Sequence, residues 1–456
     1  MIVALLLALQ AGVPSADSVP PAAASVPAAA SVPAAAAVPG AAAADTLPRV
    51  TLAEAIRRSS RLDPDYVRAV GAIDNAEWGR RAAVLAFFVP SVSLGLDETK
   101  YSQAFFNPAD PANPTSTLVV GTASANYEVF SLRKFAELGR TRAELASAEA
   151  GELEQRFQAA LETESSYYDV LVNQELLRVA RERILRAREG LGVARARVNS
   201  GAAVQTDSLQ LVLELTRAEV DALVRGNALR TAQLELGRRV GEASAVDAAP
   251  LDTMPAPDLP IGLPDALRAA LDQGPQYRVA RANERAAEAA LKSQRSDYFP
   301  TLGVGALHQR YDTEIFPGAA KVSSVTFSLS FPLWNNGLRE IEVSRARVAR
   351  DVSRTIRNDL ERAVRRDVIS AFDAYQSSRE ATRLAGVGVT VGRDNYRMQE
   401  LRYRSGASTI LDLLDAQVSL AEAEAGLVQA RYVTRLSLAR LEAILGRRLF
   451  SNKDAP

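Results

Sequence analysis

Hydrophobic residues recur about every seven positions over two very long stretches of the chain, a pattern that predicts long amphipathic helices. The first stretch covers about 132–199, contains no proline, and sets its apolar residues among Arg and Glu. The second covers about 338–403. At 1.5 Å per residue each helix would be on the order of 100 Å long, several times the diameter of a globular core, so a coiled coil is expected.

Each long stretch stops at a glycine and is followed by a second helical pattern, which predicts two helical hairpins. The first helix returns over about 206–240 after Gly201, and the second over about 409–445 after Gly406. Glycine is favoured just past a helix C-terminus because it enters the left-handed conformation without steric cost. The two hairpin tips are therefore expected near residues 201 and 406.

The period changes to two in four shorter segments, which predicts β-strands. In the first of them Val92, Leu94 and Leu96 alternate with small or polar residues, as in a strand that is wet on one side only. The expected strands lie at about 91–101, 118–129, 301–311 and 322–331. They occur as one pair before each long helix.

The same order of elements occurs twice, so the chain is interpreted as an internal duplication. Its start has a short apolar run of the length of a signal-peptide core, and a Pro-containing repeat with nothing to bury follows. The expected organisation is an incomplete signal segment at 1–12, a disordered Ala/Pro/Val linker at 13–47, a first repeat at 48–247, a linker at 248–262, a second repeat at 263–450 and a tail at 451–456.

Acidic residues follow both tip glycines. Asp207 and Asp412 each stand six residues after the glycine, where a negative charge complements the N-terminus of the next helix. Asp415 lies three residues further on the same helix face as Asp412, and its counterpart in the first copy is Gln210. The pair can be a helix-start device beside a solvated charge, or, if several chains meet at the tip, a ring of carboxylates.

Composition narrows the possible functions. The chain has 456 residues, 54 basic and 54 acidic side chains, one His and no Cys. A balanced charge gives no argument for a nucleic-acid partner. Without Cys, and with only His308, the usual zinc sites and Cys/His or Ser/His dyads are excluded unless that one His serves, and its strand-like surroundings favour an incidental surface residue. No catalytic, cofactor or metal site is expected.

The strands and the helices point to different surroundings. Each strand is about ten residues long with one apolar face, which suits a tilted β-strand that crosses a bilayer. A four-stranded sheet cannot stay open in lipid, because its edge N–H and C=O groups would be unsatisfied, so several chains are expected to pool their strands into a closed barrel. No helical run is long and apolar enough to span a membrane, so the helices are expected in water.

Over about residues 51–450 the chain resembles the TolC-like outer membrane efflux proteins. Each of the motifs is weak alone, but their order and spacing are specific. They are Thr51-Leu-Ala-Glu-Ala-Ile56, Phe88-Val-Pro-Ser91, Phe299-Pro-Thr301, Phe331-Pro-Leu-Trp-Asn-Asn-Gly337 and Tyr403-x-x-Gly406-x-x-x-x-x-Asp412-x-x-Asp415-Ala. The resemblance implies a mainly α fold with a small β part. In it, a homotrimer forms one 12-stranded outer-membrane barrel and a periplasmic α-helical barrel.

The resemblance also implies roles for residues at the tips. Asp412 and Asp415 match the acidic pore constriction of the family. The segments that match the tips that meet a periplasmic adaptor (membrane fusion) protein are Asn199, Ser200, Gly201 and Ala202, and Arg404, Ser405, Gly406 and Ala407. An inner-membrane transporter and outer-membrane lipid are the other implied partners.

A gate latch is implied as well. Tyr403 matches a gating tyrosine that bonds to the neighbouring hairpin, where Thr206 and Asp207 stand. In the family a gating Arg lies two residues after the tip glycine, and this chain has Ser408 there. The departure predicts a weaker gate.

The function expected from these features is the outer-membrane exit duct of a tripartite efflux pump, a passive channel that extends into the periplasm and exports small molecules such as drugs or toxic compounds. One alternative is the exit duct of a type I protein secretion system. Another, of a different class, is a periplasmic coiled-coil adaptor. The adaptor is disfavoured because adaptors need domains of many short strands, and only two strand pairs are expected here.

Overall fold

The computed structural model describes residues 47–450, except for 109, 252–256, 316–317 and 319. The expected signal segment at 1–12, nearly all of the expected linker at 13–47 and the tail at 451–456 lie outside the described residues. The described chain forms one folded unit that is mainly helical with a smaller β part.

The helices fall into two series of equal length. The first series is α1 (Leu52–Leu62), α2 (Pro64–Leu85), α3 (Leu132–Asn199) and α4 (Gln205–Val240). The second is α5 (Leu263–Gln273), α6 (Pro275–Ser296), α7 (Leu338–Ser405) and α8 (Ile410–Leu445). In both series the helices have 11, 22, 68 and 36 residues in that order. The repeat anticipated from the sequence therefore holds element by element.

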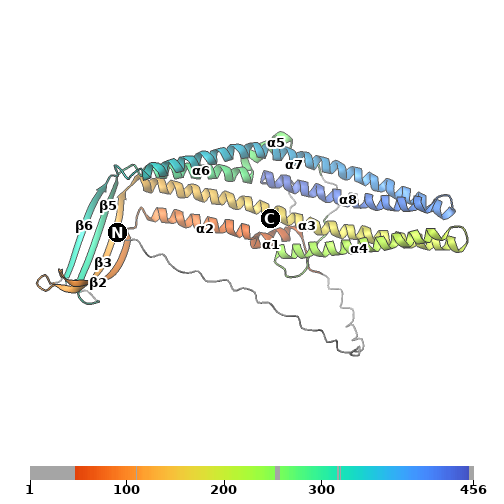
Figure 1. The fold of residues 1–456 in the computed structure, drawn as a ribbon. Coiled ribbons are helices and arrows are strands. Elements are labelled where there is room, and N and C mark those ends of the chain that lie inside the picture. Colours follow the sequence, from red (N-terminus) through yellow and green to blue (C-terminus); the bar gives the residue numbers. More distant parts are fainter. Residues whose placement is uncertain (1–46, 109, 252–256, 316–317, 319, 451–456) are drawn as a thin grey trace, which may run out of the picture. The chain divides into compact units, whose positions relative to one another are not determined.

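Local sequence signals fix where these helices begin. Thr51 caps α1 by accepting a hydrogen bond from the N–H of Glu54, and Asp63 caps α2 through the N–H groups of Asp65 and Tyr66. α3 packs along α4 and also contacts α2, α6 and α8, while α7 packs along α8 and α6, so the two series lie side by side (Figure 1). Among the described residues no helix combines the length and the apolar character needed to cross a membrane.

Four antiparallel strands form a sheet at the end of the long helices away from the hairpin tips (Figure 1). The strands are β2 (Ser91–Phe105), β3 (Thr115–Phe130), β5 (Thr301–Asp312) and β6 (Ala320–Ser330), in the order β2-β3-β5-β6. β2 and β3 are longer than the sequence pattern indicated, because backbone pairing continues where the alternation of apolar residues has faded. The β3–β5 pairing joins the two repeats in one sheet.

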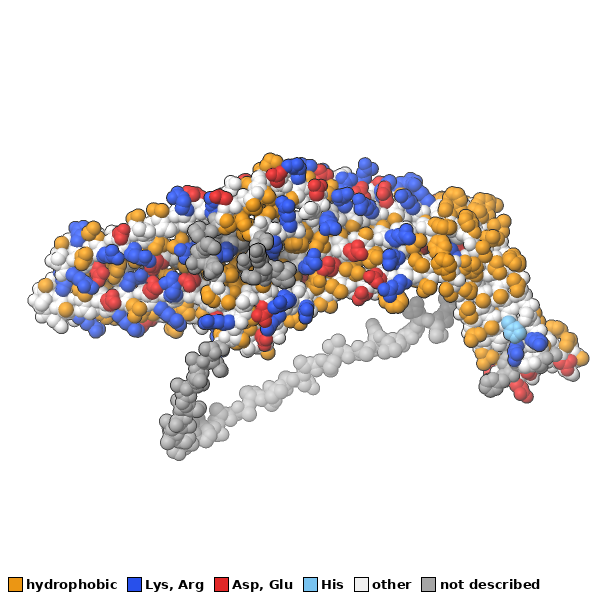
Figure 2. All heavy atoms as spheres, turned by 180° about the vertical axis from the view of Figure 1, so that it is seen from behind, with side chains coloured by type: hydrophobic (Ala, Val, Ile, Leu, Met, Phe, Trp, Pro, Cys, Tyr) orange, Lys and Arg blue, Asp and Glu red, His pale blue; other side chains and the backbone are white. Residues whose placement is uncertain are grey.

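The register gives the sheet two different faces. On one face Leu94 lies opposite Ala123, and Val304 lies opposite Phe327. On the other face the partners are small and polar, as in the pair Ser93 and Ser124, whose hydroxyl oxygens are 2.7 Å apart. The apolar side chains are well exposed in the single chain, and Figure 2 shows them gathered over the part of the sheet next to the helices. The sheet is therefore amphipathic, as the alternation predicts.

A second, parallel sheet corrects the expectation of only two strand pairs. It consists of β1 (Arg49–Val50) and β4 (Asp247–Ala248). Two residues are too few to give a periodic signal, and both strands are held by tertiary contacts: Val50 and Ala248 belong to a core that includes Tyr167, whose hydroxyl donates to the Ala249 carbonyl at 2.6 Å. The residues at the start of the expected 248–262 linker are thus part of the fold.

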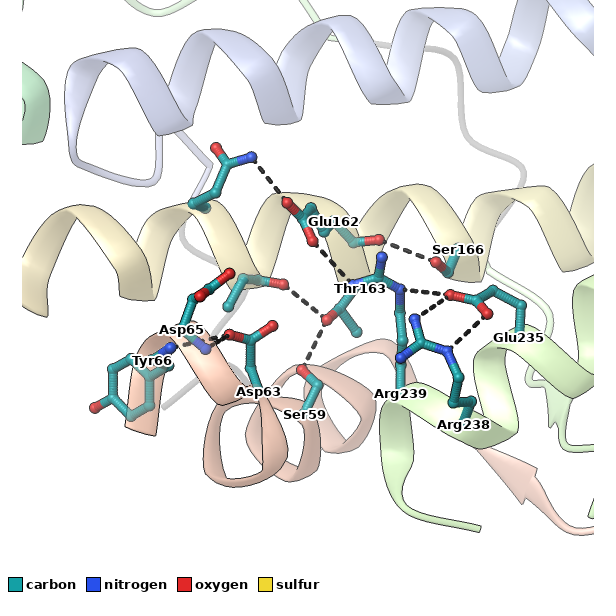
Figure 3. Close-up of polar contacts among 12 residues, drawn as sticks. Ser59, Asp63, Asp65, Tyr66, Glu162, Thr163, Ser166, Glu235, Arg238 and Arg239 are labelled. Atoms are coloured by element: carbon teal, nitrogen blue, oxygen red, sulfur yellow. Dashed lines mark hydrogen bonds and ion pairs between the residues drawn. The ribbon is translucent and has the colours of Figure 1, made fainter. Parts of the chain in front are cut away.

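Polar contacts near the middle of α3 hold the short helices in place (Figure 3). The Thr163 hydroxyl lies 2.7 Å from the Ser59 hydroxyl of α1. Arg239 of α4 donates to Glu162 of α3 at 3.1 Å and to Glu235 of its own helix at 3.2 Å. These contacts join α1 and α4 to α3, so the three helices form one unit.

An ion network between a partly exposed arginine and two buried glutamates connects the C-terminal end to α3 and α8. Arg448 pairs with Glu164 of α3 and, at 2.9 Å, with Glu442 of α8. Both glutamates are almost completely buried. Burial raises the pKa of Glu164, and the guanidinium of Arg448 opposes that rise.

We expect Arg448→Ala to destabilise the protein by about 2 kcal/mol, because it leaves two buried carboxylates without their cation; the partial exposure of Arg448 keeps the loss below that of a fully buried pair. Removing Arg448 lets burial raise the Glu164 pKa further, and a protonated Glu164 costs less to bury. Thermal unfolding should therefore show a larger loss at pH 7.5 than at pH 5. The exposed neighbour Arg447→Ala is the control, and equal losses for the two variants would contradict the assignment.

Candidate functional site

The candidate site lies at the paired hairpin tips, at the end of the helices opposite to the sheet (Figure 1). Both tips use the same turn. Gly201 and Gly406 have φ values of +73° and +82°. The N–H of Ala202 donates to the Arg197 carbonyl at 2.8 Å, and the N–H of Ala407 donates to the Arg402 carbonyl at 2.7 Å. These bonds satisfy carbonyls at the helix ends, which explains the glycine at each tip.

A shared apolar core fixes one tip against the other. Tyr403 of α7 is 1% exposed and belongs to a cluster with Leu191 and Leu211 of the first hairpin and Leu413 of the second. Residues about two hundred positions apart in the sequence are thus in contact. The tips of one chain form a packed four-helix end rather than two separate loops.

The structure brings Tyr403 together with Asp207. The tyrosine hydroxyl donates to Asp207 Oδ2 at 3.4 Å, a long hydrogen bond between the second and the first hairpin. Burial raises the pKa of Tyr403, the Asp207 charge adds to the rise, and the nearby Arg197 guanidinium opposes it. Thr206 is exposed, and its side chain makes no hydrogen bond to the part of the chain that the structure describes.

Arg197 is a residue of the site that sequence reasoning missed. Its guanidinium carbon lies 4.5 Å from the centroid of the Tyr403 ring, a distance suited to a cation–π contact. Nη1 donates to the Tyr403 carbonyl, and Nη2 donates to the Ala202 carbonyl at 3.2 Å. One side chain therefore joins the end of the first hairpin to the end of the second.

A signal for this residue was present in the duplication. Arg197 stands four residues before Gly201, and Arg402 stands four residues before Gly406. Each of the two guanidinium groups donates to a carbonyl in its own turn, the one of Arg402 to Ala407 at 3.5 Å. Of the two, Arg197 also contacts the other hairpin within the described part of the chain, and the sequence repeat does not predict that difference.

Ser408 has no part in the charged contacts. Its hydroxyl donates to the Gln399 carbonyl at 3.4 Å and is not bonded to a carboxylate. The cation that contacts Tyr403 is Arg197, on the other hairpin.

Asp412 and Asp415 are both exposed but are not equivalent. Asp412 forms a capping box with Thr409: its carboxylate accepts the Thr409 N–H at 2.9 Å, and its own N–H donates to the Thr409 hydroxyl at 3.3 Å. The hydrogen bond from the Thr409 side chain, then the one from its backbone, lowers the pKa of Asp412. Asp415 has no hydrogen bond or ion pair to any described residue.

The remaining tip residues form an exposed surface. All eight residues of the two expected adaptor-contact segments, 199–202 and 404–407, are exposed. Arg404 is paired with Glu400 on its own helix. Elsewhere, in the described ranges, no group of three or more His, Cys, Asp or Glu side chains could hold a metal ion. His308 lies on the sheet, where its Nδ1 is 2.8 Å from the Ser323 hydroxyl.

Comparison with protein families finds a match to the family described as "Outer membrane efflux protein" over residues 266–447. This range covers most of α5 and all of α6, α7 and α8, with Tyr403, Asp412 and Asp415 inside it. Among similar proteins, the pyoverdine export outer membrane protein OpmQ of Pseudomonas putida is 26% identical over 438 residues, covering 86% of this chain and 83% of OpmQ. The cobalt-zinc-cadmium resistance protein CzcC of Cupriavidus metallidurans is 25% identical over 288 residues, covering 62% of this chain and 66% of CzcC.

Solved structures share the fold at lower identity. The structure of CusC, described with transmembrane channel formation, matches with a TM-score of 0.75 and 16% identity, covering 88% of this chain and 93% of CusC. The outer-membrane channel OprN matches with a TM-score of 0.73 and 20% identity, covering 87% of this chain and 89% of OprN. The mainly helical fold with its sheet is therefore that of these channels.

Proposed function

The chain belongs to the TolC-like outer membrane efflux proteins, and we propose from this that it is the outer-membrane exit duct of a tripartite efflux pump, a passive channel that exports small molecules such as drugs or toxic compounds. One observation carries the proposal: the amphipathic sheet and the tips with their exposed carboxylates lie at opposite ends of the same helices. With 68 residues, α3 and α7 are each about 100 Å long. That length suits a conduit from a membrane into the aqueous space beside it.

The proposed assembly is a homotrimer, with four strands per chain pooled into a 12-stranded barrel in the outer membrane and the helices extending into the periplasm. Support comes from the apolar surface that the single chain leaves exposed along its helices. On α4 these side chains include Val220, Leu223 and Val224, and on α7 Val348 and Val352. Patches of this kind mark interaction surfaces, and neighbouring copies would cover them.

The proposed partners are a periplasmic adaptor protein at the exposed tips and, through it, an inner-membrane transporter. Export of small molecules is supported by the names of relatives, which include a pyoverdine export protein and an antibiotic efflux pump protein of Pseudomonas putida. No comparable observation favours protein secretion, so that alternative is an outcome of the test below.

Deletion of the gene should increase sensitivity to a panel of antibiotics, dyes and metal ions, and the intact gene on a plasmid should restore resistance. The secreted proteins of the same strains should be unchanged, because the proposed cargo is small. Unaltered sensitivity together with loss of one secreted protein would overturn the pump assignment in favour of protein secretion. Recovery of the chain as a soluble monomer in the periplasmic fraction would overturn the duct itself.

At the tip we propose that Asp412 and Asp415 form the constriction of the pore. In a trimer each would contribute three carboxylates around one axis, and acidic rings attract cations. Asp412 also caps α8, whereas Asp415 has no such structural contact among the described residues. The two positions can therefore be separated by experiment.

Asp415→Asn should lower cation selectivity in planar bilayers without changing thermal stability. Asp412→Ala should lower selectivity and also the Tm at pH 7, because it removes the capping box. A lowered pKa means that the ionised Asp412 contributes stability above its ordinary pKa, and that this contribution is lost as pH falls through the lowered value. The Tm difference should accordingly vanish in strong acid. Unchanged selectivity in both variants would leave the pair as a helix-start device only.

We further propose that Tyr403 and Asp207 form the latch that keeps the tip closed, with Arg197 holding the tyrosine ring. The hydroxyl of Tyr403 is its one polar contact with Asp207, while the ring packs in the tip core. Ser408 offers no charged contact of the kind that the family's gating Arg provides. The structure of the single chain supports this by the geometry of the contacts within it.

Tyr403→Phe removes the hydroxyl and keeps the ring, so it should raise the resting single-channel conductance without loss of the trimer. A hydrogen bond of ordinary length contributes about 1 kcal/mol, which is roughly fivefold in an equilibrium constant, so the longer bond of Tyr403 should change the closed-to-open ratio by less than about fivefold for each chain. Ser408→Arg should lower the resting conductance by adding a charged partner. Arg197→Gln should act like Tyr403→Phe. If none of the three variants shifts the closed-state conductance, the latch lies elsewhere.

A further inference from the structure

Strands β5 and β6 carry a graded series of side-chain pairs on the apolar face of the sheet. Residues directly opposite each other in an antiparallel pair project from the same face. From the helix end outward, the pairs on this face are Leu302 with Leu329, Val304 with Phe327, Ala306 with Val325, His308 with Ser323, and Arg310 with Lys321. The series runs from apolar through neutral polar to doubly basic within one column of the sheet.

The outermost pair is unfavourable by itself. Arg310 and Lys321 are like charges placed directly opposite each other, an arrangement that destabilises a sheet. Both side chains are exposed, and neither forms an ion pair with a described residue. A bound anion would remove the repulsion.

Two acidic residues on the same face of the sheet, Glu98 and Asp312, have contacts of their own. Glu98 is paired with Lys100 on β2 at 3.2 Å. Asp312, two residues beyond Arg310, accepts the N–H groups of Thr313 at 2.7 Å and of Gly318 at 3.0 Å. Neither carboxylate forms an ion pair with Arg310 or Lys321 in the described chain, so the two exposed cations remain without an anionic partner there.

The basic pair lies at the height where the outer edge of a membrane is expected. From the Leu329 pair to the Lys321 pair is eight residues, or about 27 Å along the strand. A strand tilt of about 40° reduces this to roughly 20 Å along the membrane normal, and exposed Phe331 and Trp334 continue the apolar surface toward the helices. The total approaches the roughly 25 Å apolar band of outer-membrane strands. Figure 2 shows histidine and basic side chains toward the far end of the sheet, where acidic and further hydrophobic side chains also lie.

We propose that Arg310 and Lys321 bind the phosphate group of an anionic lipid in the outer leaflet, whose acyl chains lie along the apolar pairs of the same column. This inference rests on the proposed placement of the sheet in the outer membrane. A guanidinium group can hold two phosphate oxygens at once, and an ammonium group adds a point charge beside it. The adjoining apolar pairs select a lipid over free phosphate, because inorganic phosphate has nothing to place against Val325, Phe327 and Leu329.

The test measures lipid binding to the detergent-purified full chain by native mass spectrometry. The probes are bisphosphorylated lipid A, phosphatidylethanolamine, an uncharged diacylglycerol, and inorganic phosphate as a competitor. We expect retention of lipid A to exceed that of the uncharged lipid. Arg310→Gln and Lys321→Gln should each weaken it about tenfold, since each removes a charge-assisted contact, and the double variant should weaken it further. Lys100→Gln, on the same face but already paired with Glu98, is the matched control and should change little.

Several outcomes would overturn the proposal: equal retention of lipid A by the double variant and the intact chain, equal retention of the uncharged lipid, or complete displacement of lipid A by inorganic phosphate at equal concentration. The proposed duct is tested separately, by membrane fractionation and by channel conductance of the same variants. We expect both to be preserved in Arg310→Gln and Lys321→Gln. Loss of lipid retention with intact conductance supports the site. Retained channel activity with unaltered lipid retention refutes the site and leaves the duct standing.

Discussion

The two outer strands of the sheet, β2 and β6, each leave one row of backbone N–H and C=O groups without a partner strand in the described chain. In water such edges are tolerated, but in hydrocarbon each unsatisfied group costs several kcal/mol. The apolar face of the sheet favours hydrocarbon surroundings, whereas the unpaired edge groups disfavour them. A single chain therefore cannot place this face in hydrocarbon and also satisfy its edge groups. In the proposed assembly, pairing of β6 in one copy with β2 in the next would satisfy these edge groups, and it would set the helices of the copies around a common axis.

The duplication determines which residues each chain places at its two hairpin tips. Both series have helices of identical length, so the tips of one chain end at the same level, and β3–β5 pairing makes a single sheet of the two halves. Equal length does not mean equal chemistry. The second tip carries Asp415 where the first has Gln210, and Arg197 reaches across to Tyr403 while Arg402 bonds within its own turn. The two hairpins thus have the same backbone lengths but carry different side chains at their tips.

Features written in local sequence could be predicted, and features made by distant contacts could not. The long helices, their glycine turns and the alternation of β6 depend on residues close together in the sequence. Gly406 therefore predicted a hairpin turn, and the alternation that includes Phe327 predicted a strand. β1 and β4 are two residues long and exist because Val50 and Ala248 pack in the core around Tyr167. The contact of Arg197 with Tyr403 spans 206 residues. The sequence allows Asp412 to be either a helix cap or a pore carboxylate. The structure forms the cap, while the pore role stays a prediction, and Asp415 is the less constrained charge.

The contacts at the tip also define which motion they can oppose. Arg197 to Tyr403 and Tyr403 to Asp207 both join the two hairpins of the same chain. Such contacts resist a movement in which one hairpin swings away from the other, but they offer no resistance when both hairpins of a chain move as one body. Ser408 adds no charged contact to this pair, because its hydroxyl bonds to the Gln399 carbonyl of its own hairpin. With Ser408 at this position, the described contacts restrain separation of the hairpins within one chain, and in the proposed trimer any restraint between chains would come from the surfaces through which the copies pack.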